Sequence, residues 1–152
     1  MPSIVDALMV LRVRSGTIDG EGVVCGADGV TDFDALWAAV AKKGSRAAFL
    51  YAFDLLELDG ADLRREPWET RRATLASLMR KVNPGIRLSE HLCAGDGEAV
   101  FMHACRMGLE GIVAKRRDSR YRSGRSTDWI KVKNPDAPAA SRLIEGWPSG
   151  GS

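Results

Sequence analysis

The sequence predicts an α+β fold in which antiparallel sheet is flanked by helices. Helical and strand patterns are mixed along the 152 residues without a regular βαβ alternation, which argues against a doubly wound fold. One strongly apolar segment, 47–58, has the character of a buried strand. Two shorter strand patterns, 109–115 and 129–133, are joined by a polar, arginine-rich loop.

The first half of the chain is predicted to contain two helices and two strands. In order, these are a helix over 2–11, a strand over 17–25 broken at 19–22, a helix over 33–42 and the buried strand over 47–58. Asp32 is expected to cap the second helix and Gly44 to end it. Its apolar side is predicted to comprise Phe33, Leu36, Trp37 and Val40.

The second half is predicted to contain two helices and three strands. A helix from Pro67 to about Lys81 places Leu75, Leu78 and Met79 inward. A strand over 86–92, a helix over 96–107 ended by Gly108, and the strands over 109–115 and 129–133 follow. The composition of residues 136–152, rich in Pro, Ala, Gly and Ser, predicts a flexible tail.

Composition and charge narrow the function classes. Apolar residues make up 45% of the chain and charged residues 28%, as in ordinary globular domains. The N-terminus lacks the pattern of a secretory signal, so we expect a cytoplasmic location and no membrane partner. The net charge is only +2. Basic residues nevertheless cluster over 115–133, where they outnumber acidic ones, and this clustering favours a polyanionic partner.

The three cysteines do not form a persuasive metal or disulfide pattern. His91 with Cys93, and His103 with Cys105, have the short spacing of ligand pairs. Positions two apart on a helix do not face each other, however, and the second pair falls in a helical pattern. We therefore expect thiols without a zinc ion.

Four short segments carry the candidate chemistry, and they are residues 18–24, 51–56, 110–115 and 129–135. Carboxylates at strand ends, Glu21 and Glu110, suit a hard divalent cation and sugar hydroxyls. Phe53 offers a flat surface on which a base can stack. Lys131 and Lys133 are two apart on a strand, so both ammonium groups point from one face and can neutralise a phosphate. Each segment alone is typical of a structural position in a turn, a core or a solvent-exposed strand face. A nucleotide site, however, needs all of these groups together: a base platform, a sugar contact, a metal ion and cations for the phosphate.

In this order and spacing, the four segments resemble motifs III, IIIa, IV and V of the covalent nucleotidyltransferase superfamily. The fuller pattern is similar to the ATP-dependent DNA ligases of bacterial end-joining repair. That likeness is carried by Met-Gly-Leu-Glu-Gly-Ile-Val-Ala-Lys-Arg-Arg at 107–117, Tyr-Arg-Ser-Gly-Arg at 121–125, and Phe-Asp-Leu-Leu at 53–56 before Asp59-Gly60 and Leu63. It implies that residues 1–135 are a partial adenylation domain of the covalent-nucleotidyltransferase (ATP-grasp-like) fold.

The resemblance also implies an activity. Enzymes of this family attack ATP with a lysine, pass AMP from that lysine to the 5′-phosphate of a nick, and seal the strand when the 3′-hydroxyl displaces AMP. ATP, Mg²⁺ and nicked or broken duplex DNA are the implied cofactors and partner.

Roles for individual residues follow from the same resemblance. Glu21 would bind the ribose or a metal, Phe53 would stack on adenine, and Glu110 would support the metal. Lys131 and Lys133 would hold the α-phosphate. The residues expected to meet DNA phosphates are Arg116, Arg117, Arg122 and Arg125.

One element of the family pattern is missing from these 152 residues. The nucleophile belongs to a Lys-x-Asp-Gly motif, and none of the six lysines is followed by x-Asp-Gly. Thr17-Ile18-Asp19-Gly20 has threonine in that place, and a hydroxyl cannot form the lysyl phosphoramidate. Because that lysine is missing, we expect no self-adenylylation and no catalytic residue in this chain. The OB-fold that follows the family's adenylation domain is also not found in these residues.

Several functional interpretations are open on the sequence alone. The chain can be half of a split ligase completed by a second chain, a non-catalytic DNA- or nucleotide-binding remnant, or a degenerate product. An RNA ligase or capping enzyme is a further alternative within the superfamily. Because missing strands would leave an open apolar edge, we also expect low stability or self-association.

Overall fold

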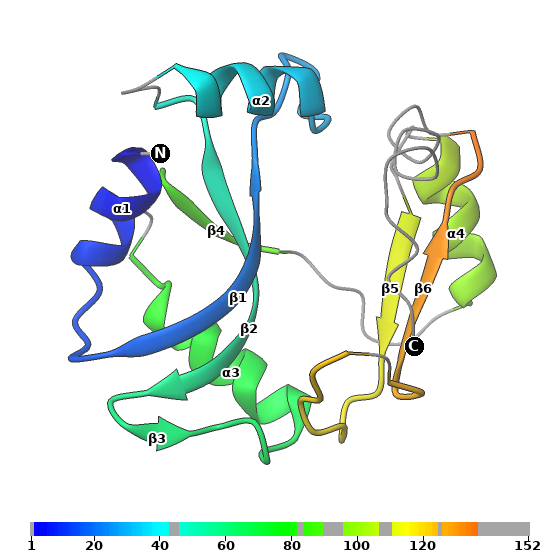
Figure 1. Cartoon of the computed structure of the whole chain (residues 1–152). Coiled ribbons are helices and arrows are strands. Elements are labelled where there is room, and N and C mark those ends of the chain that lie inside the picture. Colours follow the sequence, from blue (N-terminus) through cyan, green and yellow to red (C-terminus); the bar gives the residue numbers. More distant parts are fainter. Residues whose placement is uncertain are drawn as a thin grey trace. The chain divides into compact units, whose positions relative to one another are not determined.

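The computed structural model describes residues 2–42, 46–81, 84–89, 96–106, 111–124 and 126–136. The chain forms two compact units. The larger unit comprises Met1–His91 and Lys115–Asp128, and the smaller comprises Leu92–Ala114 and Trp129–Ser152. Figure 1 labels the helices and strands of both.

A four-stranded sheet organises the larger unit. Strand β2 (Phe49–Leu58) pairs antiparallel with β1 (Gly16–Val23) and with the short β3 (Ala61–Asp62). Strand β4 (Ile86–Leu88) pairs with β2 in the parallel direction, as a crossover through an intervening helix allows. The predicted α+β class with antiparallel sheet is therefore confirmed, with β4 as a parallel exception that the sequence pattern did not reveal.

Two irregularities shape the long β1–β2 pairing. The register shifts between Thr17 and Ile18 and again between Asp19 and Gly20. The predicted break in the first strand is therefore wrong, because β1 continues through this region with bulges. Phe53 and Leu56 of β2 are the residues left without a Cα partner on β1 at these shifts.

The core of the larger unit lies where helices α1 (Pro2–Met9) and α3 (Trp68–Leu78) meet the sheet. Both helices were predicted, and they end within three residues of the predicted limits. Small and branched apolar side chains fill the contact, namely Ala7, Ala52, Leu55, Leu75 and Ile86. Figure 1 shows β1 and β2 running side by side with α1 and α3 beside them.

Helix α2 (Phe33–Ala41) confirms the predicted cap. The Asp32 carboxylate accepts a hydrogen bond from the Ala35 amide at 2.8 Å. The helix contacts β1. On its predicted apolar face, Trp37 is 61% exposed and Val40 is 48% exposed, so this face is not fully covered.

The smaller unit contains helix α4 (Gly97–Arg106) and most of a two-stranded sheet of β5 (Gly111–Lys115) and β6 (Trp129–Lys133). Lys115, the last residue of β5, belongs to the larger unit. The two strand arrows run in opposite directions in Figure 1. All three elements were predicted. Gly44 and Gly108 lie outside the described residues, and so does the expected flexible tail over 136–152 apart from Asp136.

Metal-ligand clusters and membrane-spanning helices can be looked for only among the residues that the structure describes. No three His, Cys, Asp or Glu side chains are grouped there to hold a metal ion. His103 and Cys105 lie on α4, whereas His91 and Cys93 are outside the described residues. None of the described helices is long and apolar enough to cross a membrane.

Candidate functional site

Phe53, the predicted base platform, lies at a distinctive position of β2. Its neighbours on β2, Ala52 and Asp54, pair with Gly20 and Asp19, so Phe53 is the extra residue at a bulge. Bulges commonly redirect a side chain next to a functional site. The Phe53 ring is half-buried, and the Lys115 Nζ lies 5.9 Å from its centroid. A half-buried flat ring with a nearby cation is therefore present.

Glu21 stands on the neighbouring strand. It is exposed, and its Cα partner on β2 is Tyr51. The glycine before it is required by close packing, because a side chain at Gly20 would meet the Tyr51 carbonyl and come within 3.2 Å of the Ala52 Cα. Gly20 thus allows β1 to approach β2 beside Phe53.

Lys115 is a site residue that was recognised in a motif but not assigned a role from the sequence. It ends β5 and is half-buried, and burial lowers the pKa of its ammonium group. The carboxylates of Asp54 and Asp19 act in the opposite direction and favour the charged form. Its position beside Phe53 depends on the fold of residues far apart in sequence, and only its place at the end of a strand hinted at this.

Tyr121 connects the arginine-rich loop to β1. Its hydroxyl donates a hydrogen bond to an Asp19 carboxylate oxygen at 3.4 Å. Burial, followed by the negative charge of Asp19, raises the pKa of the Tyr121 phenol. The Asp19-Gly20-Glu21 segment therefore contacts the loop through Asp19 and faces solvent through Glu21.

The predicted DNA-contacting arginines differ in their surroundings. Arg116 forms ion pairs with Asp118 at 3.2 Å and Asp128 at 3.4 Å. Arg117 pairs with Glu69 at 3.1 Å. These pairs are largely exposed and contribute little on their own.

Two other arginines in the described part of the loop have no such neighbours. Within the described part of the chain, Arg122 and its neighbour Arg120 are exposed and have no carboxylate partner. Arg125 lies outside the described residues. The free positive charge of the described loop is therefore concentrated at Arg120 and Arg122.

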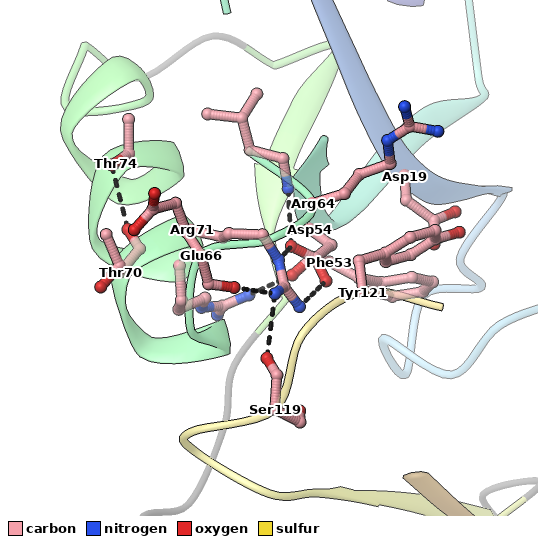
Figure 2. A network of polar contacts seen from close by, with 12 residues as sticks. Asp19, Phe53, Asp54, Arg64, Glu66, Thr70, Arg71, Thr74, Ser119 and Tyr121 are labelled. Carbon is pink, nitrogen blue, oxygen red and sulfur yellow. Dashed lines mark hydrogen bonds and ion pairs between the residues drawn. The ribbon is translucent and has the colours of Figure 1, made fainter. Parts of the chain in front are cut away.

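A buried ion pair lies beneath this loop (Figure 2). The Arg71 guanidinium donates to both Asp54 carboxylate oxygens, at 2.7 and 2.9 Å, and both side chains are 0% exposed. The same guanidinium donates to the carbonyls of Glu66 at 2.6 Å and Ser119 at 3.0 Å. The helical pattern of α3 did not predict this burial, because arginine at an ordinary helix position is expected in solvent.

Lys131 and Lys133 lie in the smaller unit, both exposed on β6. Alternation along the strand places their side chains on one face, as the spacing predicted. Gly111 of β5 allows the two strands to approach, since a Cβ there would come within 2.9 Å of the Lys133 Cα. Glu110, the second predicted carboxylate, is outside the described residues.

These features describe an α+β protein with a half-buried aromatic ring beside a lysine, an exposed glutamate and an arginine-rich loop in its larger unit, and two exposed lysines on one strand of its smaller unit. Comparison with known proteins identifies the class more closely. The family profile described as "ATP dependent DNA ligase domain" matches residues 2–133. The chain belongs to the ATP-dependent DNA ligase domain family.

Individual relatives agree with this assignment. The multifunctional non-homologous end joining protein LigD of Pseudomonas aeruginosa is 42% identical over 136 residues, covering 88% of this chain and 16% of its own length. The Bacillus subtilis SPbeta prophage-derived DNA ligase-like protein LigB is 36% identical over 132 residues, covering 85% of this chain and 48% of its own. The chain thus spans about a sixth to a half of these curated relatives.

Solved structures show the same relationship. The ligase domain of Mycobacterium tuberculosis LigD aligns with a TM-score of 0.64 and 36% identity, covering 78% of this chain and 38% of that one. A mycobacterial DNA ligase D structure complexed with ATP and MES gives the same TM-score, identity and coverage. The predicted family and the partial adenylation-domain fold are therefore confirmed.

Proposed function

We propose that this chain forms the nucleotide- and DNA-contacting part of an ATP-dependent DNA ligase that seals strand breaks in end-joining repair. The observation that supports it most directly is the arrangement around Phe53. The bulge that presents this ring, the Lys115 cation at 5.9 Å and the Asp19–Tyr121 contact to the basic loop all occur within the larger unit. A base platform and a polyanion-binding loop are thus parts of one folded body.

In this proposal, the site residues act on the nucleotide through stacking, hydrogen bonding and charge neutralisation. Phe53 stacks on adenine, and Glu21 accepts hydrogen bonds from the ribose hydroxyls. Lys131 and Lys133 neutralise the charge that develops on the α-phosphate during adenylate transfer. Lys115 adds positive charge beside the platform.

The two carboxylates of the candidate site are enough for the divalent cation that the proposed reaction needs. Mg²⁺ needs only one or two protein carboxylates when the nucleotide phosphates and water supply the remaining oxygens. Glu21 and Glu110 are the carboxylates proposed to hold it. Bound there, Mg²⁺ would neutralise phosphate charge.

DNA is bound in this proposal through phosphates. Arg122 and Arg120 provide exposed, uncompensated charge within the described loop. Arg116, Arg117 and Arg125 extend the same basic segment. Such contacts give binding that weakens with salt and does not depend on base sequence.

The 152 residues are not proposed to start the reaction by themselves, because no lysine in them stands in a Lys-x-Asp-Gly motif. The same observation favours a second candidate function, a binding module that contacts nucleotide and DNA without chemistry. The two candidates differ in whether a polypeptide that supplies the lysine restores adenylate transfer.

Incubation with α-labelled ATP and magnesium, followed by denaturing electrophoresis, tests the proposal. We expect no labelled band from the chain alone. When a ligase fragment carrying Lys-x-Asp-Gly is added, we expect label on that fragment, and loss of this label when Lys131 and Lys133 are both changed to Ala.

Two other labelling results would contradict the proposal or favour the binding module. A labelled band on the chain itself would show that one of its own lysines is a nucleophile. No label on the added fragment, together with salt-dependent DNA binding, would favour the binding module. A Lys131→Arg, Lys133→Arg variant is the matched control that keeps both charges.

A further inference from the structure

The arginine-rich loop is anchored at every second residue, twice on the first turn of α3 and once on the segment that precedes this helix. The Glu69 amide donates to the Arg117 carbonyl at 3.0 Å, and the Trp68 amide donates to the Ser119 carbonyl at 2.8 Å. The Tyr121 amide in turn donates to the Arg64 carbonyl at 2.8 Å. Amides of a helical first turn have no partner within their own helix, so the loop satisfies two of them.

Arg117 is exposed, but from Ser119 onward burial alternates along the loop. Ser119 is buried and Tyr121 is partly buried, whereas Arg120 and Arg122 are exposed. The residues tied to α3 and β1 therefore fix the loop from within. The arginines between and after them are directed to solvent.

Arg71 is the side chain that holds this arrangement together. Its Nη1 reaches the carbonyls of Glu66 and Ser119, which lie before α3 and in the loop respectively. Its Nε and Nη2 are occupied by Asp54 of β2. Its guanidinium also lies 5.9 Å from the centroid of the Tyr121 ring (Figure 2).

The planar guanidinium is suited to this task in a way that lysine is not. Its donors point in fixed directions, so two can grip a carboxylate while others reach separate carbonyls. An ammonium group of the same charge has no fork and a shorter reach. The Asp54 carboxylate also accepts a hydrogen bond from the Leu55 amide at 2.9 Å. This bond ties the carboxylate of the ion pair to the backbone of β2.

We propose that Arg71 is a positioning residue for nucleic-acid binding: from beneath the loop, it sets the direction in which Arg120 and Arg122 meet DNA phosphates. Arg71 is 0% exposed and touches no phosphate itself. This inference rests on the proposed binding of DNA by the loop. It adds a residue of α3, outside the four motifs, to the binding machinery.

The test compares Arg71→Lys with Leu75→Ala in the whole chain. Leu75 is one turn further along α3 and is fully buried in the core, so its truncation destabilises the unit while leaving the hydrogen bonds to the loop in place. Both variants are treated with trypsin well below their unfolding midpoints. Cleavage after Arg116, Arg117 and Arg120 is measured by mass spectrometry against cleavage after the exposed Arg12.

We expect loop cleavage to accelerate several-fold in Arg71→Lys and to keep the wild-type ratio in Leu75→Ala. Duplex DNA binding is then measured over a range of salt. The slope of log affinity against log salt should become shallower by about 0.9 for each phosphate that is no longer neutralised, and we expect about two such phosphates in Arg71→Lys. In Leu75→Ala, the slope should remain that of the wild type.

Three results would overturn the proposal: unchanged loop cleavage in Arg71→Lys, equal acceleration in Leu75→Ala, or faster cleavage with an unchanged salt slope. If Arg71→Lys does not fold, Asp54→Asn, which keeps an acceptor for Arg71 but removes the charge, is measured in the same way. A wild-type chain that fails to bind duplex DNA would reject the proposed DNA contact, while the cleavage ratio would still report whether Arg71 anchors the loop.

Discussion

At the scale of single residues, the candidate site is built around Phe53. The ring is presented by an irregularity of β2, with Lys115 on one side and the Asp19–Tyr121 contact nearby. Sequence reasoning identified Phe53 and Glu21 because both lie in short motifs. It gave no role to Lys115 or Tyr121, because their neighbours Asp19 and Phe53 are distant in sequence.

Replacing Phe53 with Ala should weaken ATP binding by the chain by about 1–3 kcal/mol, since a stacked base contributes about this much. Phe53→Tyr and Phe53→Trp keep a flat ring and should retain most of the affinity. Isothermal titration calorimetry with ATP measures the difference. Equal affinities for the Ala and Tyr variants would remove Phe53 from the nucleotide site.

The Tyr121 phenol should ionise at higher pH than an ordinary tyrosine, because burial and the Asp19 carboxylate both oppose a phenolate. Tyr121 is the only tyrosine left in a Tyr51→Phe variant. In that variant, absorbance at the tyrosinate band should give a midpoint above 10.0. Adding Asp19→Asn should lower the midpoint only partly, because burial is the larger cause.

The Tyr121 shift has a consequence for stability. A phenol whose pKa is raised in the folded state stabilises that state below the unfolded pKa of about 10. This contribution is lost as pH rises through the folded pKa. A midpoint at or below 10.0 would show that Tyr121 is not buried against Asp19.

At the scale of elements, β1 and β2 are defined by their two register shifts. The residues of β2 that pack on the core are Leu50, Ala52, Leu55 and Leu58, spaced by two, three and three. Regular alternation would have placed Asp54 with Ala52. The strand itself was predicted from its apolar content. A bulge adds one residue without changing that content, so the sequence could not reveal which β2 side chains face the core.

Arg71 and Arg72 show the same limit for helices. Both are buried on α3, although arginines in a helical pattern are expected in solvent. Their burial depends on acceptors elsewhere, Asp54 and Ser119 for Arg71 and Ser89 for Arg72. Helix limits and apolar faces are local properties that a sequence reveals, whereas the partner of a buried charge is set by the tertiary fold.

Gly20→Ala should lower the free energy of unfolding by about 1–3 kcal/mol, the usual cost of forcing extra atoms into a packed contact. The new methyl group would meet the Tyr51 carbonyl and push β1 away from β2. Gly16→Ala on the same strand is the matched control, because its nearest neighbour, the Glu57 carbonyl, would be at an ordinary 3.7 Å. Equal stability of the two variants in urea unfolding would contradict the close approach.

At the scale of the whole molecule, large apolar side chains remain exposed in both units. In the smaller unit, Val113 is 51% exposed and Ile130 is 58% exposed. On β6, alternation places Ile130 and Val132 on the face opposite Lys131 and Lys133. In the larger unit, a groove of about 350 Å³ is lined mainly by apolar residues of α1, the segment that follows it, β1 and β2, and by Leu78 of α3.

Such surfaces favour association. We expect the purified 152-residue chain to self-associate with rising concentration in sedimentation velocity measurements. Ile130→Thr combined with Val113→Thr should reduce the association, while Lys42→Thr, which changes an exposed site at the end of α2, should not. A monomer at all concentrations, with cooperative unfolding in denaturant, would contradict the expectation.

The anchoring of the loop on α3 also has a consequence for synthesis on the ribosome. Arg71 and Ser119 are 48 positions apart, and Asp54 precedes both. During synthesis, Asp54 and Arg71 therefore leave the ribosome before Ser119 does. Because a domain generally folds as a unit, we expect the larger unit to complete its fold only after the segment around Ser119 and Tyr121 has emerged.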